Sequence, residues 1–158
     1  MFTDQPYNRT LDDFSVAREF EHWPHKTVTE SDNNLFCLLT MNHHPLHLDA
    51  EYARTQQHGK IVVVGTYVLS LVVGMTVPDI SGASIANLEY KRITHHAPVF
   101  VGDTLRARSK VLEVNPSKNK PDRGVVTIET KAYNQKNEMV LTLRRKVLIP
   151  KKLPKSSG

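Results

Sequence analysis

The pattern of hydrophobic and polar positions divides the chain into a helical first half and a second half made of strands. In the first half, Leu35, Phe36, Leu38 and Leu39 recur at the spacing of one helical face. Thr29 is a candidate N-cap for this helix, because acidic residues follow it within one turn. The segment 42–45 should end the helix, and Asp49 should cap a short helix over residues 50–55.

Residues 61–77 form the most apolar segment of the chain and contain no charged side chain. They include many β-branched residues, but the length of the segment favours a helix that is apolar almost all round. The segment is shorter than the ~20 residues that a helix needs to cross a bilayer. We therefore expect a buried central helix and no membrane association.

The second half alternates between apolar and polar residues with a period of two, which is typical of antiparallel strands with one wet face. We expect four strands, at residues 84–94, 103–115, 125–134 and 138–149. Such one-sided strands must cover something apolar, and an apolar helix must be covered. The sequence thus predicts an α+β domain in which a curved antiparallel sheet wraps around the helix at 61–77, which is the hot-dog fold in outline.

Length and composition limit the alternatives. A chain of 158 residues with 39% hydrophobic residues suits one domain, which we place at residues 1–150, followed by a disordered tail at 151–158. Cys37 is the only cysteine, which fits a reducing compartment, and we expect a cytoplasmic protein. The net charge is +5, but no aromatic residues are interleaved with a stripe of basic residues, as in many nucleic-acid-binding proteins. A phosphorylated small molecule such as coenzyme A is therefore expected as the partner, and nucleic acid is not.

The segment 40–49, TMNHHPLHLD, places three histidines and a proline in a polar loop between two helical patterns. Such loops commonly carry catalytic groups, and a titratable site beside an apolar segment suits chemistry on an acyl chain. His43, His44, His47 and Asp49 are also adequate zinc ligands by type. Because adjacent histidines tend to point apart, we expect no metal. Cys37 is expected to pack in the core, and His95 and His96 to lie at a strand end or on the surface.

Three segments resemble the MaoC-like, (R)-specific enoyl-CoA hydratase family of hot-dog proteins. They are Asn42–Asp49, Gly65 near the start of the central helix, and the segment 97–105, APVFVGDTL. The similarity in order and spacing runs from about Val28 to Leu148. Within the family, residues 87–88, 118–124 and 133–135 are more similar to members that act on branched dicarboxylic acyl-CoAs such as mesaconyl-CoA and itaconyl-CoA.

The resemblance implies a catalytic group made of His47, Asn42 and Gly65. His47 would act as the general base and acid, because the pKa of histidine lies near working pH. The family usually has aspartate where this chain has Asn42; an amide cannot accept a proton but can orient a water molecule. The N–H of Gly65 would hold the enolate oxygen at a helix N-terminus. Each residue also has a structural alternative: a loop–helix hydrogen bond for His47, a helix C-cap for Asn42 and tight packing for Gly65.

Four further residues are expected to bind substrate. Pro45 and Val64 flank the proposed catalytic positions, and Lys91 and Arg92 are candidates for coenzyme A phosphates or a substrate carboxylate. A solvated strand face is the alternative for the two cations.

The resemblance therefore implies a hydro-lyase that adds water reversibly across the Cα=Cβ bond of an enoyl-CoA and needs no cofactor. A hot-dog thioesterase is one alternative, although residues 61–77 lack the carboxylate that many such enzymes carry there. A non-catalytic acyl-CoA-binding protein is another, favoured by Asn42. Because an isolated sheet of this kind leaves its edges open, we expect a homodimer or a larger homo-oligomer.

Overall fold

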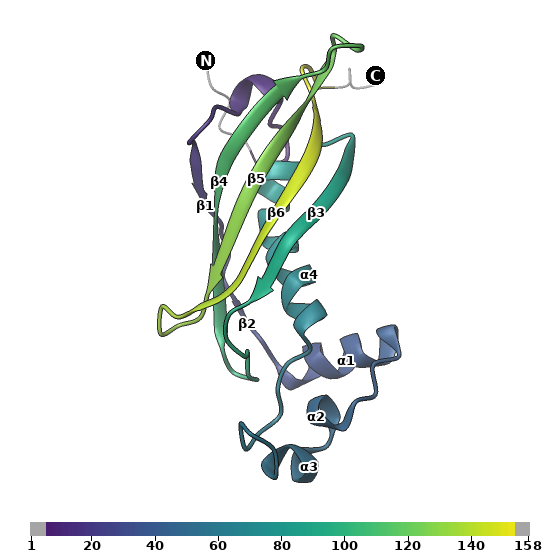
Figure 1. Cartoon of the computed structure of the whole chain (residues 1–158), viewed down its shortest axis with the longest axis vertical. Coiled ribbons are helices and arrows are strands. Elements are labelled where there is room, and N and C mark those ends of the chain that lie inside the picture. The colour runs from purple at the N-terminus through teal and green to yellow at the C-terminus, as the bar shows by residue number, and fades with distance from the viewer. Residues whose placement is uncertain (1–5, 154–158) are drawn as a thin grey trace.

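The computed structural model describes residues 6–153, so most of the expected tail at 151–158 lies outside the described residues. The helices and strands follow the predicted order, with α1–α3 at one end of the molecule (Figure 1). The helices are α1 (Glu30–Thr40), α2 (Pro45–Leu48), α3 (Ala50–Arg54) and α4 (Gly65–Thr76), with a 3₁₀ turn at Leu11–Asp13 and a π-helical turn at Val77–Ser81. The strands are β1 (Glu19–Glu21), β2 (Lys26–Thr27), β3 (Ala86–His95), β4 (Thr104–Pro116), β5 (Arg123–Tyr133) and β6 (Met139–Pro150).

The strands form one antiparallel sheet in the order β1-β4-β5-β6-β3. The short strand β2 pairs with the first residues of β4. The sheet curves around α4, which runs along its concave side (Figure 1). This arrangement confirms the predicted α+β class and the central helix. The short strands β1 and β2 were not predicted, because segments of three and two residues are too short to show a period.

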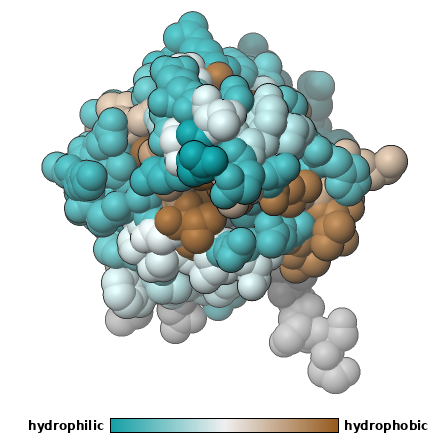
Figure 2. Space-filling view, turned by 90° about the horizontal axis from the view of Figure 1, so that it is seen from below, coloured by the Kyte–Doolittle hydropathy of each residue, from teal (hydrophilic) through white to brown (hydrophobic). Residues whose placement is uncertain are grey.

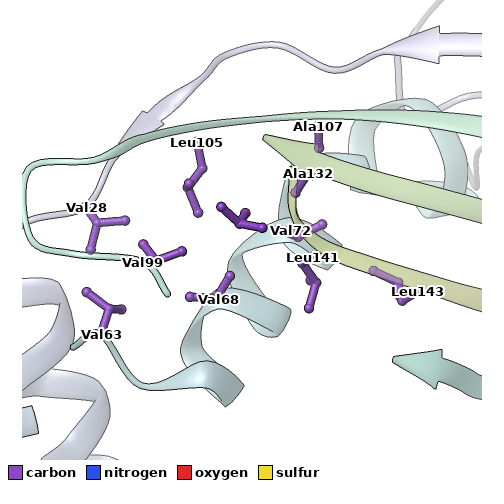
Figure 3. Close-up of a cluster of buried hydrophobic side chains, with 11 residues drawn as sticks. Val28, Val63, Val68, Val72, Val99, Leu105, Ala107, Ala132, Leu141 and Leu143 are labelled. Atoms are coloured by element: carbon purple, nitrogen blue, oxygen red, sulfur yellow. The ribbon is translucent and has the colours of Figure 1, made fainter. Parts of the chain in front are cut away.

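Along β4, buried and exposed side chains alternate as the sequence pattern predicts. On this strand, Leu105 and Ala107 are buried against the helix. Together with Val68 and Val72 of α4 and residues of β5 and β6, they form the core that Figure 3 shows. A second cluster packs under the other end of the sheet, around Ile80 and Ile128.

The helix over 61–77 is shorter than predicted, because residues 61–64 are extended. Val63 donates its N–H to the carbonyl of Val99 at 2.8 Å, and Val62 forms an isolated bridge with Phe100. Four consecutive β-branched residues favour this extended conformation. The helix begins at Gly65 and ends at Thr76, two residues before Pro78. In the part of the chain described here, no helix is both long enough and apolar enough to cross a bilayer.

The capping predictions for α1 and α3 are confirmed. Thr29 Oγ1 accepts the N–H of Asp32 at 3.1 Å, and the Asp32 carboxylate accepts the N–H of Thr29 at 2.9 Å. The contact of Asp32 with the Lys26 ammonium, together with the Thr29 N–H, lowers the Asp32 pKa to about 2. Asp49 accepts the N–H of Tyr52 at 2.9 Å and begins α3.

The predicted apolar face of α1 is not buried in this chain. Leu35, Leu38 and Leu39 are exposed, whereas the buried residues of α1 are Asn33 and Cys37. Seen from the end that carries α1–α3, the surface shows brown apolar patches between hydrophilic residues (Figure 2). The periodicity identified a helix correctly, and three leucines of its apolar face lie on the surface of this chain.

Candidate active site

A pocket of about 330 Å³ lies between α2, the start of α4 and the segment that follows β3. Of the described residues, those that line it carry no carboxylate, ammonium or guanidinium group. Its polar side chains are all imidazoles, contributed by His47, His58, His95 and His96, and the remaining lining comes from Gly65 and the apolar residues of the segments 62–68 and 97–99. The site is thus a pocket of mixed polar and apolar lining with several titratable groups.

His47 lies on the one-turn helix α2, which Pro45 begins at its first position. Its Nδ1 lies 2.6 Å from the carbonyl oxygen of Val62. Because a carbonyl only accepts hydrogen bonds, Nδ1 carries the hydrogen of the neutral imidazole. Nε2 is then the nitrogen left with a lone pair, which is the state that a general base requires.

Gly65 is the first residue of α4, and no side chain caps this helix N-terminus. The N-cap residue, Val64, has a side chain without an acceptor. The N–H groups of the first turn therefore keep their capacity to bind an oxygen atom, and the helix dipole favours negative charge there. His47 and Gly65 line the same pocket.

His95 lies against Gly65 at the end of β3. A Cβ atom added at position 65 would lie 3.1 Å from Cε1 and 3.2 Å from Nε2 of His95, closer than ordinary van der Waals contact. The imidazole therefore occupies space that any larger residue at position 65 would need. His96 Nε2 bonds to the hydroxyl of Thr142 at 2.9 Å, and the ring of His58 packs edge-on against Phe100.

Sequence analysis did not assign a role to His58, His95 or His96. His95 does end a strand, as expected, but the chain then turns so that both histidines reach the pocket. The signal available in the sequence was their position directly before the motif at 97–105. Asn33, a buried residue that contacts the site, was also missed, because an asparagine in a helix gives no pattern.

The other predicted site residues lie outside the pocket lining. Asn42 follows α1, and its side-chain oxygen accepts the N–H of His44 at 3.3 Å. The left-handed residue that ends α1 is Met41, so Asn42 does not take the C-cap position. Lys91 and Arg92 lie on β3, where Lys91 pairs with Glu89 at 3.4 Å.

The histidines of the loop are not arranged as a metal site. No group of three or more His, Cys, Asp or Glu within residues 6–153 is placed to hold a metal ion. His44 Nδ1 instead accepts the N–H of Leu46 at 3.1 Å and caps α2. Cys37 packs in the interior, where burial raises the pKa of its thiol. Burial also raises the pKa of Tyr67, in the first turn of α4, to about 12.

Comparison with known proteins places this geometry in a family. The family described as "MaoC like domain" matches residues 13–134. A mesaconyl-CoA hydratase from Cereibacter sphaeroides is 35% identical over 91% of this chain, and the chain spans 42% of that relative's length. An (R)-specific enoyl-CoA hydratase from Aeromonas caviae is 28% identical over 73% of this chain and 81% of its own.

Solved structures agree with the fold. A protein named monoamine oxidase regulatory protein, from Archaeoglobus fulgius, is 32% identical, with a TM-score of 0.81 over 93% of this chain and 97% of its own. A Mycobacterium tuberculosis protein described as having a double hot-dog fold shares 20% identity, which supports the fold alone. It has a TM-score of 0.83 over 96% of this chain and 47% of its own. The hot-dog prediction is thereby confirmed.

Proposed function

The chain belongs to the MaoC-like domain family, and from that premise we propose that it hydrates enoyl-CoA thioesters reversibly. The observation that carries the proposal is the shared pocket of His47 and Gly65. Relatives named as mesaconyl-CoA hydratase and (R)-specific enoyl-CoA hydratase support the same reaction class. The chain covers about two fifths of the length of the mesaconyl-CoA hydratase. The reaction is therefore a proposal for this chain.

In the proposed reaction, His47 Nε2 takes a proton from water as the oxygen attacks the β-carbon. The electron pair of the double bond moves to the α-carbon and on to the thioester oxygen, where the N–H of Gly65 holds the enolate. The imidazolium then returns a proton to the α-carbon. The steps use only water, the His47 imidazole and the backbone N–H of Gly65, so the proposal includes no cofactor.

Asn42 is proposed to orient the water or the loop that carries His47. Its amide holds the N–H of His44 and thereby the turn that leads into α2. Pro45 and Val64 are proposed to shape the approach to the pocket, and Lys91 and Arg92 to meet the coenzyme A phosphates from β3.

We further propose a branched dicarboxylic enoyl-CoA as the preferred substrate. Two similar relatives are named mesaconyl-CoA hydratase and beta-methylmalyl-CoA dehydratase, the latter 33% identical over 91% of this chain. In this pocket only imidazoles and backbone N–H groups can meet a second carboxylate. His95 is one of the imidazoles of this lining, and we propose it for that contact.

The lining argues against a thioesterase that activates water with a carboxylate. No residue of α4 is acidic, and neither is any residue that lines the pocket. A non-catalytic binding protein would need no base, whereas here Val62 holds His47 in the tautomer that suits one.

A coupled assay with crotonyl-CoA and mesaconyl-CoA tests the proposal. We expect loss of the absorbance of the conjugated thioester without release of free thiol. His47→Ala should lower kcat by at least about 10²-fold, because the base is removed. His43→Ala is the matched control, since this exposed histidine of the same loop does not line the pocket. Thiol release, or full activity in His47→Ala, would contradict the proposal.

The substrate preference is tested with His95→Gln. We expect this variant to lose rate on mesaconyl-CoA while its rate on crotonyl-CoA, which has no second carboxylate, changes little. An equal loss on both thioesters would assign His95 to the common chemistry and would contradict the proposed role in substrate choice.

We also propose that the chain assembles as a homodimer or larger homo-oligomer through β3. This strand has β6 as its neighbour on one side and ends the sheet on the other. Leu88, Tyr90 and Ile93 on β3 are exposed. Such an edge is a ready surface for another hot-dog unit. Leu88→Lys should lower the mass measured by light scattering, whereas Val16→Lys, at an exposed apolar residue elsewhere, should not.

A free cysteine in the core and a coenzyme A ester as substrate both fit the cytoplasm, which we propose as the location of the protein.

A further inference from the structure

Asn33 connects the two halves of the candidate site through its side-chain amide. Asn33 lies on α1, and its side chain is fully buried. Its Nδ2 donates to the backbone carbonyl of His47 at 2.9 Å, and its Oδ1 accepts the backbone N–H of Val64 at 3.1 Å. One planar amide thus holds the residue proposed as base and the residue that precedes the proposed enolate-binding N–H.

We propose that Asn33 is a positioning residue, which sets the separation between the His47 imidazole and the N–H of Gly65. The inference rests on the proposed hydration reaction. Asn33 contacts the backbone of both segments and lies outside the lining of the pocket, so it acts through them.

The geometry requires an amide at this position. One side must donate to a carbonyl, and the other must accept from an N–H, and asparagine supplies both from a rigid plane. A carboxylate of the same shape would keep the bond to Val64 but would set an oxygen against the carbonyl of His47. A hydrophobic side chain would leave both backbone groups buried without partners, which costs free energy.

Two further hydrogen bonds join the same two segments directly. His47 Nδ1–H donates to the carbonyl of Val62, two residues before Val64, and Val62 N–H donates to the carbonyl of Leu46 at 3.3 Å. The segments 46–47 and 62–64 are therefore joined at their edges by direct bonds, while Asn33 joins them from the α1 side. Loss of Asn33 leaves the direct bonds but lets the two segments shift against each other.

The test compares Asn33→Asp and Asn33→Ala with the parent chain at a temperature where thermal scans show each protein folded. Because displacement of about 1 Å can cost about 10²-fold in rate, we expect kcat to fall by about 10- to 100-fold in both variants. KM should change less than about threefold, because the pocket that holds the thioester keeps its own residues. Asn34→Ala is the matched control, since this neighbour has no hydrogen-bond partner for its side chain among the described residues.

The split between kcat and KM separates positioning from a purely structural role. A structural role would lower the melting temperature and leave the kcat of the folded protein unchanged, and that result would overturn the inference. If Asn33→Ala does not fold, Asn33→Asp decides, because it retains the shape and one bond. A parent chain that hydrates none of the thioesters would end the proposed function, whereas an active parent with fully active Asn33 variants would end this inference alone.

Discussion

At position 65, the absence of a side chain lets an imidazole lie against the start of α4. The nearest ring atom of His95 would be 3.1 Å from a methyl group added there. By contrast, a Cβ added at Gly74 of the same helix would meet nothing within 4 Å. A side chain at position 65 would therefore crowd His95, whereas one at position 74 would not. Of the two glycines, Gly65 lines the candidate active site.

Gly65→Ala should lower the activity of the chain without unfolding it. The added methyl must displace His95 and would stand beside the N–H that we propose for the enolate. We expect kcat/KM to fall by about 10- to 100-fold, since one donor to an oxyanion is commonly worth more than this. Gly74→Ala is the control, and alanine there should even favour the helix. Equal activity in the two variants would show that the space at position 65 is not used.

The single residues differ in how well the sequence predicted them. His47 and Gly65 were assigned from motif spacing, and the structure brings both to one pocket, although their roles stay predictions. Asn33 and His95 could not be found in this way. Their importance comes from contacts with segments far along the chain, at separations of 14 and 31 residues for Asn33. Spacing along a sequence carries no record of such contacts.

At the scale of single elements, α1 offers a direct measurement of a cap. Its N-terminus carries both hydrogen bonds of a capping box, between Thr29 and Asp32. Thr29→Ala should lower the free energy of unfolding by about 1 kcal/mol. Urea unfolding measures this. The control is Thr40→Ala, at the other end of the helix, where the hydroxyl bonds to the carbonyl of Phe36 and should contribute little. A larger loss in the control than in the cap variant would contradict the assignment.

The elements were predicted best where one face is wet and the other dry. The strands β4, β5 and β6 have such faces, so alternation identified them, whereas β3 is exposed along most of its length. The segment at 61–77 has no polar face, so its pattern could not show where strand-like backbone gives way to helix. The change occurs at Gly65, because Val63 pairs with Val99 before the helix begins.

At the scale of the whole molecule, a buried polar cluster joins the N-terminal segment to the sheet. His22 Nδ1 lies 2.8 Å from the carboxylate of Asp79, and Nε2 lies 2.7 Å from the hydroxyl of Ser109. Arg9 pairs with the same carboxylate at 3.2 Å. Burial lowers the pKa of His22, and nearby Arg145 lowers it further, whereas Asp79 and Glu21 oppose the shift.

This cluster should make the stability of the chain depend on pH. Below the ordinary pKa of about 6.5 the unfolded chain binds a proton at His22 that the folded chain resists, so the free energy of unfolding falls as pH falls. His22→Gln removes this contribution. The drop in melting temperature between about pH 7.5 and about pH 5.5 should therefore be smaller in the variant than in the parent. His25→Gln, at an exposed histidine nearby, should keep the drop of the parent. An unchanged drop in His22→Gln would contradict the assignment.

The valine that precedes α4 has a thermodynamic consequence. A helix whose first turn lacks a side-chain acceptor is held less firmly than one with a cap, and here that turn borders the pocket. An oxygen atom of a bound molecule that accepts those N–H groups would serve as the missing cap. Occupancy and folding are then linked, so the protein should withstand heat better as the concentration of such a molecule rises.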